Sequence, residues 1–223
     1  MGKQWVRQEV KKDWLQEVTE DLTVWVSKNQ QTAALAAGGI LAAVAAIGFF
    51  VYRTHAVQSA AWDRLALAED AYYSGQPEAA AKQIQELVGA YPNSAAASYG
   101  LLFQADILYP RGQYKEALEN YNKILERGQP QVLQPLALGG SVLAQEAAGQ
   151  CQPAAQGAQH FLELYADHFL APQVHASLAR CEQTQGLTEQ ARNAYQKITL
   201  QYPDTSWAVW AKKRLDALAT GHK

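Results

Sequence analysis

The sequence predicts an all-α protein in which one N-terminal transmembrane helix precedes a superhelix of about four helical hairpins and a capping helix. Two observations carry this prediction. Gly75, Gly112, Gly149 and Gly186 follow one another at intervals of 37 residues, and equal spacing over four copies indicates an internal repeat. Residues 33–52 form an unbroken apolar stretch, which is long enough to cross the hydrocarbon core of a membrane.

The residues that follow each glycine are typical of the second helix of a hairpin. Glycine tolerates the left-handed conformation that ends a first helix. Alanine five positions later lets the second helix pack close to the first. Bulky residues at positions nine and twelve fill the seam between the helices, and in three copies a proline then stops the second helix. The alanines are Ala80, Ala117, Ala154 and Ala191; position nine holds Ile84, Tyr121, Ala158 and Tyr195; position twelve holds Leu87, Ile124, Phe161 and Ile198.

This pattern resembles the tetratricopeptide repeat, in the slightly lengthened form common in bacterial envelope proteins, and the resemblance implies a right-handed superhelix. An irregular helical bundle is the alternative. The third copy is the weakest match, because alanine stands at its first bulky position. We expect repeats at about 60–93, 97–130, 134–168 and 171–204, followed by a cap at 205–220.

In the tetratricopeptide family, the first helix of each repeat lines a concave groove, and five positions before the glycine face that groove. The resemblance therefore implies an aromatic groove in the first two copies. Aromatic side chains in a groove commonly anchor a bound peptide, but each could instead pack against the neighbouring helix. The expected partner-binding anchors are Trp62, Tyr72, Tyr99, Phe103 and Tyr109. The full groove set is Trp62, Leu65, Ala66, Glu69 and Tyr72; Tyr99, Leu102, Phe103, Asp106 and Tyr109; Leu136, Gly139, Gly140, Leu143 and Glu146; and Gln173, Ala176, Ser177, Arg180 and Gln183.

Residues 1–32, which precede the apolar stretch, predict a cytoplasmic amphipathic helix. Their apolar residues recur at spacings of three and four, which places them on one stripe of a helix. The stripe could lie on the membrane surface or bind a partner helix, or the segment could merely extend the span inward. The stripe consists of Val6, Val10, Trp14, Val18, Leu22 and Trp25.

Residues 33–52 predict the transmembrane helix, and the basic residues around it predict its orientation. Five basic residues precede the span, whereas only Arg53 and Arg64 follow it closely. By the positive-inside rule the N-terminus is cytoplasmic and residues 53–223 are periplasmic, so we expect a single-pass protein of the bacterial inner membrane. A cleaved signal peptide is the alternative, although the apolar stretch exceeds the usual length. No proline or glycine interrupts 55–71, which predicts one continuous helix from the span into the first repeat.

Small residues recur every four positions along the span, at Ala34, Gly38, Ala42 and Ala46. Small residues at that spacing let two membrane helices approach closely. The pattern is consistent with a homodimer, although any alanine-rich helix shows it.

The two cysteines are predicted to lie at the same edge of the stacked hairpins. Cys151 opens the second helix of the third copy, and Cys181 lies late in the first helix of the fourth. A disulfide between them is geometrically plausible, and a periplasmic location permits it. The alternative is that both are unpaired and serve as small core residues.

Nothing in the sequence indicates catalysis. The five histidines form no metal-ligand spacing, and the chain contains neither a nucleophile elbow nor a phosphate-binding glycine loop. The net charge of −2 argues against nucleic acid as a partner. We therefore expect no catalytic residue, no metal and no cofactor, and an enzyme would need a site that these motifs do not describe.

Two stretches resemble the family of the ancillary subunit of the bacterial Sec translocon, an inner-membrane protein with a periplasmic tetratricopeptide domain. They are FFVYRTHAVQSAAW (49–62) and YGLLFQADILYPRGQYKEALENYNKIL (99–125). The repeat ends AYPNS (90–94) and QYPDTSWAVWAKKRL (201–215) are more similar to Tol-Pal-associated periplasmic repeat proteins and outer-membrane assembly lipoproteins.

The first resemblance implies a function for the whole chain. It would be a membrane-anchored protein-binding module that docks on the translocon or a similar envelope machine. Its partners would be the subunits of that machine and the exported chains held in its groove. The alternative is a structural adaptor subunit of a stable membrane complex, held through residues 1–52.

Overall fold

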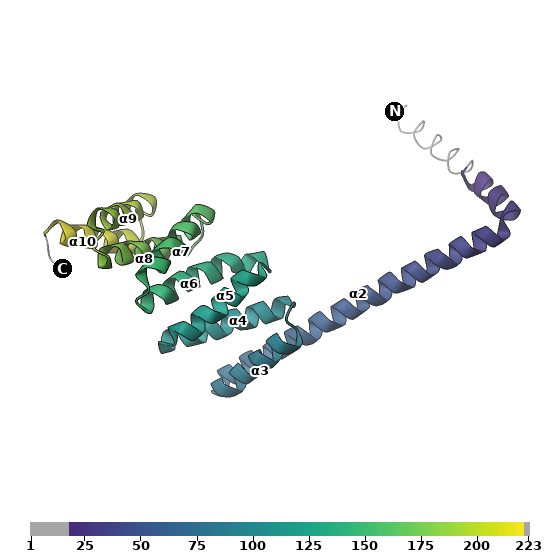
Figure 1. The fold of residues 1–223 in the computed structure, drawn as a ribbon, viewed down its shortest axis with the longest axis horizontal. Coiled ribbons are helices and arrows are strands. Elements are labelled where there is room, and N and C mark those ends of the chain that lie inside the picture. Colours follow the sequence, from purple (N-terminus) through teal and green to yellow (C-terminus); the bar gives the residue numbers. More distant parts are fainter. Residues whose placement is uncertain (1–17, 221–223) are drawn as a thin grey trace, which may run out of the picture. The chain divides into compact units, whose positions relative to one another are not determined.

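A computed structural model describes residues 18–220, which are helical apart from turns and contain no strand (Figure 1). The predicted all-α class is therefore confirmed. Residues 18–28 are helical. The other α-helices are α2 (Gln30–Tyr73), α3 (Pro77–Ala90), α4 (Ala95–Leu108), α5 (Tyr114–Arg127), α6 (Gln134–Ala147), α7 (Cys151–Leu164), α8 (Ala171–Thr184), α9 (Thr188–Gln201) and α10 (Ser206–Ala219), with short 3-10 turns at η1 (Tyr109–Arg111) and η2 (Gln131–Leu133).

The chain divides into two compact units, one ending at Ala56 and the other beginning at Val57. Helix α2 begins in the first unit and ends in the second, and among the described residues it is the one helix long and apolar enough to cross a membrane. Large apolar side chains in its first-unit part, such as Leu35 and Phe50, are exposed. Because α2 runs without interruption to Tyr73, the predicted continuous helix over residues 55–71 is confirmed. The membrane span itself stays a prediction.

The predicted amphipathic stripe before the span is described only in part. Val18, Leu22 and Trp25 lie on the helical residues 18–28 and are exposed. The other three members of the stripe, Val6, Val10 and Trp14, lie outside the described residues.

The second unit consists of helical hairpins that follow one another along the chain (Figure 1). The end of α2 pairs with α3, then α4 with α5, α6 with α7, and α8 with α9, while α10 covers the last pair. Each helix from α3 to α10 packs against the next, and α6 also contacts α8, so the first helices of successive hairpins lie side by side. The glycines of the 37-residue repeat end the first helices with φ between 75° and 78°, as predicted.

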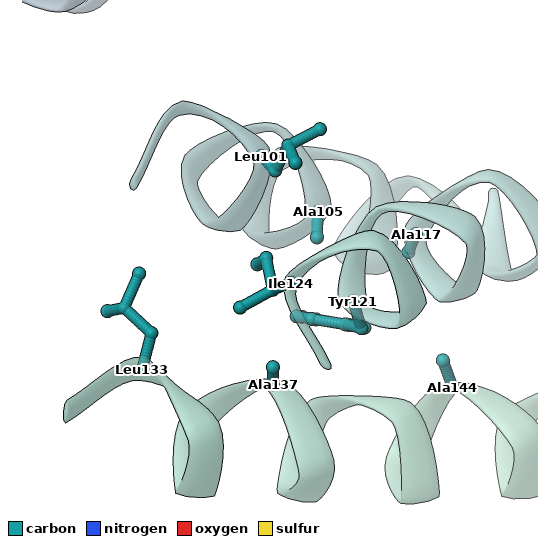
Figure 2. Close-up of a cluster of buried hydrophobic side chains, with 8 residues drawn as sticks. All are labelled: Leu101, Ala105, Ala117, Tyr121, Ile124, Leu133, Ala137 and Ala144. Atoms are coloured by element: carbon teal, nitrogen blue, oxygen red, sulfur yellow. The ribbon is translucent and has the colours of Figure 1, made fainter. Parts of the chain in front are cut away.

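The seam residues predicted from the repeat are buried. Ile84, Ile124, Phe161 and Ile198 have no exposed surface, and Tyr121 is 4% exposed. Figure 2 shows the cluster around α5, where Tyr121 and Ile124 lie between α4 and α6. The hydrophobic effect over these seams holds each hairpin together and joins it to the next.

One contact in this cluster leaves no space for a side chain. The ring of Tyr121 lies against the backbone of α6 at Gly140. A Cβ atom added at Gly140 would stand 2.5 Å from Cζ of Tyr121, well inside van der Waals contact. The glycine therefore sets how closely α5 and α6 approach.

Helix α8 carries three of the buried polar residues of the second unit. His175, Ser177 and Glu182 are buried, and each has one polar atom without a hydrogen-bond partner. Burial lowers the pKa of His175, the positive charge of Lys197 acts in the same direction, and a hydrogen bond with Gln201 opposes both. His175 is therefore neutral in the folded chain near neutral pH.

Replacing Gly140 with alanine is expected to destabilise the fold by about 1–3 kcal/mol, because the added methyl group overpacks the seam at Tyr121. Gly89→Ala is the matched control. It lies in α3 with open space around it, so alanine should stabilise by up to about 1 kcal/mol through helix propensity. Urea unfolding followed by circular dichroism measures both changes. Equal stability of the two variants would contradict the described contact.

The stability of the second unit is expected to fall as the pH drops below the ordinary histidine value of 6.5. The unfolded chain takes up a proton on His175 in that range, whereas the folded chain resists it until the pH passes its lower folded pKa. Thermal unfolding of wild type and His175→Gln at about pH 7 and about pH 5 measures the effect. His160→Gln, at an exposed position of α7, is the control.

The replacement of His175 should flatten the pH dependence, and that of His160 should not. Burial raises the pKa of Glu182, which therefore contributes stability at low pH that is lost as the pH rises. Because Glu182 is present in all three proteins, the difference between them isolates His175. An unchanged slope in His175→Gln would refute this assignment.

Candidate functional site

A pocket of about 290 Å³ opens between the first helices of the second, third and fourth hairpins. Seven of the nine residues that line it belong to the groove set expected from the repeat pattern, and the other two are Tyr121 and Leu170. Seven of the twenty expected groove positions therefore share one hollow surface, and the groove role of the others stays a prediction. The lining residues are Leu102, Asp106, Tyr109, Tyr121, Leu136, Gly140, Leu143, Leu170 and Gln173.

The pocket contains one carboxylate, that of Asp106, which is hydrogen-bonded to Tyr121. The hydroxyl of Tyr121 donates a hydrogen bond of 2.9 Å to Oδ1 of Asp106. Burial raises the pKa of Asp106, and the hydrogen bond from Tyr121 lowers it by less. Burial also raises the pKa of Tyr121, and the neighbouring charge of Asp106 raises it further. By its accessible surface, Asp106 is nevertheless exposed to solvent.

Among the described residues, no basic side chain pairs with Asp106. The three ion pairs found there are Arg64 with Glu86, Arg180 with Glu146, and Arg192 with Glu189. The carboxylate of Asp106 is therefore partly desolvated and has no counter-charge.

Four of the expected anchors form two aromatic pairs between α2 and α4. The ring centroids of Trp62 and Tyr99 are 5.3 Å apart, and those of Tyr72 and Phe103 are 5.5 Å apart in an edge-to-face arrangement. Trp62 is nevertheless 42% exposed, and the other three are partly exposed. The rings thus pack against the neighbouring first helix and still present a face to solvent, so their binding role stays a prediction.

The fifth expected anchor, Tyr109, lies apart from the aromatic pairs and lines the pocket. Helix α4 ends at Leu108, two residues before Pro110, and Tyr109 is the first residue of the short turn η1. Its ring stands 5.4 Å from that of Tyr114 at the start of α5. Of the five expected anchors, Tyr109 is therefore the one that lines this pocket.

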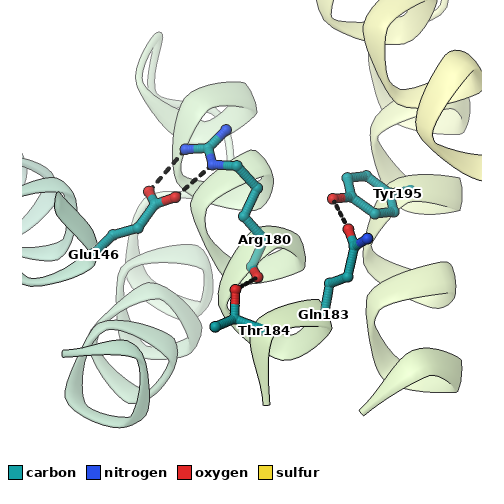
Figure 3. Close-up of polar contacts among 5 residues, drawn as sticks. All are labelled: Glu146, Arg180, Gln183, Thr184 and Tyr195. Atoms are coloured by element: carbon teal, nitrogen blue, oxygen red, sulfur yellow. Dashed lines mark hydrogen bonds and ion pairs between the residues drawn. The ribbon is translucent and has the colours of Figure 1, made fainter. Parts of the chain in front are cut away.

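An ion pair crosses the groove between the third and fourth hairpins (Figure 3). Arg180 of α8 donates two hydrogen bonds to Glu146 of α6, from Nε to Oε1 and from Nη2 to Oε2, the latter at 2.7 Å. Such a two-point pair is among the stronger polar contacts in proteins. Arg180 and Arg214 also lie 5.5 and 5.6 Å from the centre of the Trp210 ring. Because Glu146 is occupied by Arg180, its charge is not free for a ligand.

Sequence reasoning missed the Asp106–Tyr121 pair and Leu170. Tyr121 was expected only as a seam residue, yet the same position in the fourth copy shows the same behaviour, since the hydroxyl of Tyr195 donates to Gln183 at 3.0 Å. A buried tyrosine usually needs a partner for its hydroxyl, and this rule could have indicated both pairs. Leu170 lies between α7 and α8, and no signal in the repeat pattern places it in the groove.

The two cysteines are close together, as their places in the stack predicted. Cys151 begins α7 and Cys181 lies near the end of α8, and their thiols are close enough to interact. Burial raises the pKa of the Cys181 thiol, and the neighbouring Cys151 thiol raises it further. Both are free thiols in this structure, so the disulfide stays a prediction.

The predicted membrane-packing residues lie on α2. Ala34, Gly38, Ala42 and Ala46 are exposed, and a Cβ added at Gly38 would meet only open space. Over residues 18–220, no cluster of three or more His, Cys, Asp or Glu side chains is arranged to hold a metal ion.

Oxidised glutathione is expected to convert the two thiols into a disulfide and to lower the intact mass by two protons. Closing a loop of about 30 residues should stabilise the folded chain by roughly 3–4 kcal/mol in the chain-entropy model. Mass spectrometry and urea unfolding, each with and without reductant, measure these effects. Cys151→Ala, which cannot form this bond, is the control, and neither its mass nor its stability should depend on the reductant. An unchanged mass of the oxidised wild-type chain would exclude the bond.

Comparisons with known proteins agree with the geometry. A family model described as tetratricopeptide repeat matches residues 177–205, which span most of α8, all of α9 and the turn after it. No curated protein matches the sequence significantly.

Two solved structures share the fold at low sequence identity. The crystal structure of YrrB, described as a TPR protein with an unusual peptide-binding site, is 16% identical with a TM-score of 0.55, over 72% of this chain and 77% of that one. A structure of nearly identical TPR-like repeats assigned to a kinesin light chain of Podosopora anserina is also 16% identical with a TM-score of 0.55, over 71% of this chain and 84% of that one. The second unit of this chain therefore has the fold of a tetratricopeptide-repeat superhelix.

Proposed function

We propose that this chain is a membrane-anchored protein-binding module whose groove holds an extended segment of a partner protein. One observation carries the proposal. Partly exposed aromatic rings lie on α2 and α4, and α4 also lines a pocket between α4, α6 and α8. Aromatic anchors beside a concave pocket are the usual features of a peptide-binding surface.

The fold supports this proposal. Tetratricopeptide superhelices are protein-interaction modules, because their stacked hairpins offer a long concave surface that a partner chain can occupy. They are generally not enzymes. YrrB, which shares the fold, is described as having a peptide-binding site. By analogy, we assign peptide binding to the concave face of this chain.

The exposed apolar surface of α2 supports anchoring in a membrane. With the basic residues mainly before the span, the repeats would lie in the periplasm of a bacterial inner-membrane protein. The partners would then be exported chains and the subunits of an envelope machine, with the Sec translocon as the first candidate because of the family resemblance. A homodimer through the small residues of α2 would give an assembly with two grooves.

Exposed apolar residues before the span favour a second candidate function. Leu22 is 60% exposed and Trp25 is 48% exposed on the helical residues 18–28. These side chains would suit the binding of another membrane subunit. In that case the chain would be a structural adaptor held through residues 1–52, and the groove would be secondary.

Photo-crosslinking in living bacterial cells distinguishes the two candidates. A photo-reactive amino acid replaces Phe103 in the groove, or Trp14 near the N-terminus. The same replacement of Glu163, an exposed residue on the second helix of the third hairpin, is the control. We expect exported proteins or translocon subunits at the Phe103 probe and none at the Glu163 probe, with adducts identified by mass spectrometry. One fixed partner at Trp14 and no adduct at Phe103 would reject the groove function and favour the adaptor.

A further inference from the structure

We propose that the pocket between α4 and α6 takes the side chain of a lysine or arginine from the bound segment, with its cation placed on Asp106. This inference rests on the proposed peptide-binding function and adds a specificity to it. The segment would be recognised by a basic residue at this pocket and by apolar or aromatic contacts toward the first hairpin.

The walls of the pocket suit the stem of such a side chain. Leu102, Leu136 and Leu143 approach from α4 and α6, and Leu170 closes the side toward α8. Lysine and arginine carry several methylene groups before their charge, and these stems pack well on apolar surface. At about 290 Å³, the pocket is at the lower end of the range for small-molecule sites, so one long side chain suits it better than a larger ligand.

The charge of the pocket determines what the tip of that side chain must be. Asp106 has no basic partner among residues 18–220, and Glu146, the nearby carboxylate in the groove set, is already held by Arg180. The hydroxyl of Tyr121 binds Oδ1 of Asp106, so the second oxygen remains for a ligand. Tyr109 also lines the pocket and is partly exposed, and the face of its ring would attract a cation.

Other occupants fit less well. An acidic side chain would meet the negative charge of Asp106, and a purely apolar one would desolvate that charge further without pairing it. A divalent cation would find a single carboxylate, whereas calcium and magnesium sites need more oxygen ligands. A basic side chain alone satisfies both the leucine walls and the unpaired carboxylate.

A phage-displayed library of random linear peptides, selected on the full chain in detergent, tests this inference. Peptides enriched on the wild type should carry lysine or arginine at one common position. Asp106→Asn should lose that enrichment, because asparagine keeps the shape and can still accept the bond from Tyr121 but has no charge. Asp106→Ser is a second variant, and Glu163→Gln, which removes an exposed carboxylate of α7, is the control. Circular dichroism verifies that every variant is folded.

A synthetic copy of the best peptide, labelled with fluorescein, gives the quantitative test. Replacing its basic residue with glutamine should weaken binding to the wild type about tenfold, as measured by fluorescence anisotropy. The same replacement should change binding to Asp106→Asn little, since the partner charge is already absent.

The outcomes separate the inference from the proposed function. Peptides that bind without a basic preference, or that keep this preference on Asp106→Asn, would overturn the inference and leave the groove function intact. A chain that selects no peptide at all would overturn both. A basic preference that is lost only in the Asp106 variants supports both.

Discussion

The second unit depends on a left-handed backbone conformation that only glycine adopts without steric cost. At Gly75, Gly112, Gly149 and Gly186 the chain leaves a first helix with φ near 75° and enters the second helix within two residues. The reversal sets the two helices side by side, and their seam residues then face each other. Since every hairpin uses the same turn, successive hairpins repeat the same rotation and stack into a superhelix.

In two hairpins, a residue that fills the seam between the helices also forms a hydrogen bond with a groove residue. A tyrosine at the first bulky position fills the seam with its ring, and its hydroxyl reaches a polar residue on the first helix, as in Tyr121 with Asp106 and Tyr195 with Gln183. The absence of a side chain at Gly140 lets the Tyr121 ring approach α6. Tyr121 therefore belongs both to the interior and to the wall of the pocket. A change in how its ring packs would also change its hydrogen bond to Asp106, the charged residue of the pocket.

Sequence reasoning reached the features that depend on neighbours along the chain. The glycine spacing gave the hairpins and their buried seams, and counting back from each glycine gave seven residues of the pocket. It also brought Cys151 and Cys181 together, because a regular stack fixes which helix ends are adjacent.

What the sequence could not show depends on three helices meeting in space. Leu170 reaches the pocket from a connection between α7 and α8, and the Asp106–Tyr121 bond joins two helices in a direction that periodicity does not describe. The sequence also could not show how closely Trp62 and Phe103 pack on the neighbouring helix, because a ring at a groove position can face either that helix or solvent. Such features follow from side-chain geometry rather than from spacing.

The order of contacts in the stack has a consequence for cooperativity. In the described part of the second unit, the helices from α3 to α10 pack mainly against their neighbours in the chain, and α8 also contacts α6 and α10, so the hairpins form an open one-dimensional array. An array of this kind can fray from an end, and its two halves stay coupled only through the junction between them. The Glu146–Arg180 pair and the two thiols all lie at one junction, between the third and fourth hairpins. That junction follows the copy with the weakest repeat pattern, so these contacts join the third hairpin to the fourth in addition to the packing of α7 on α8.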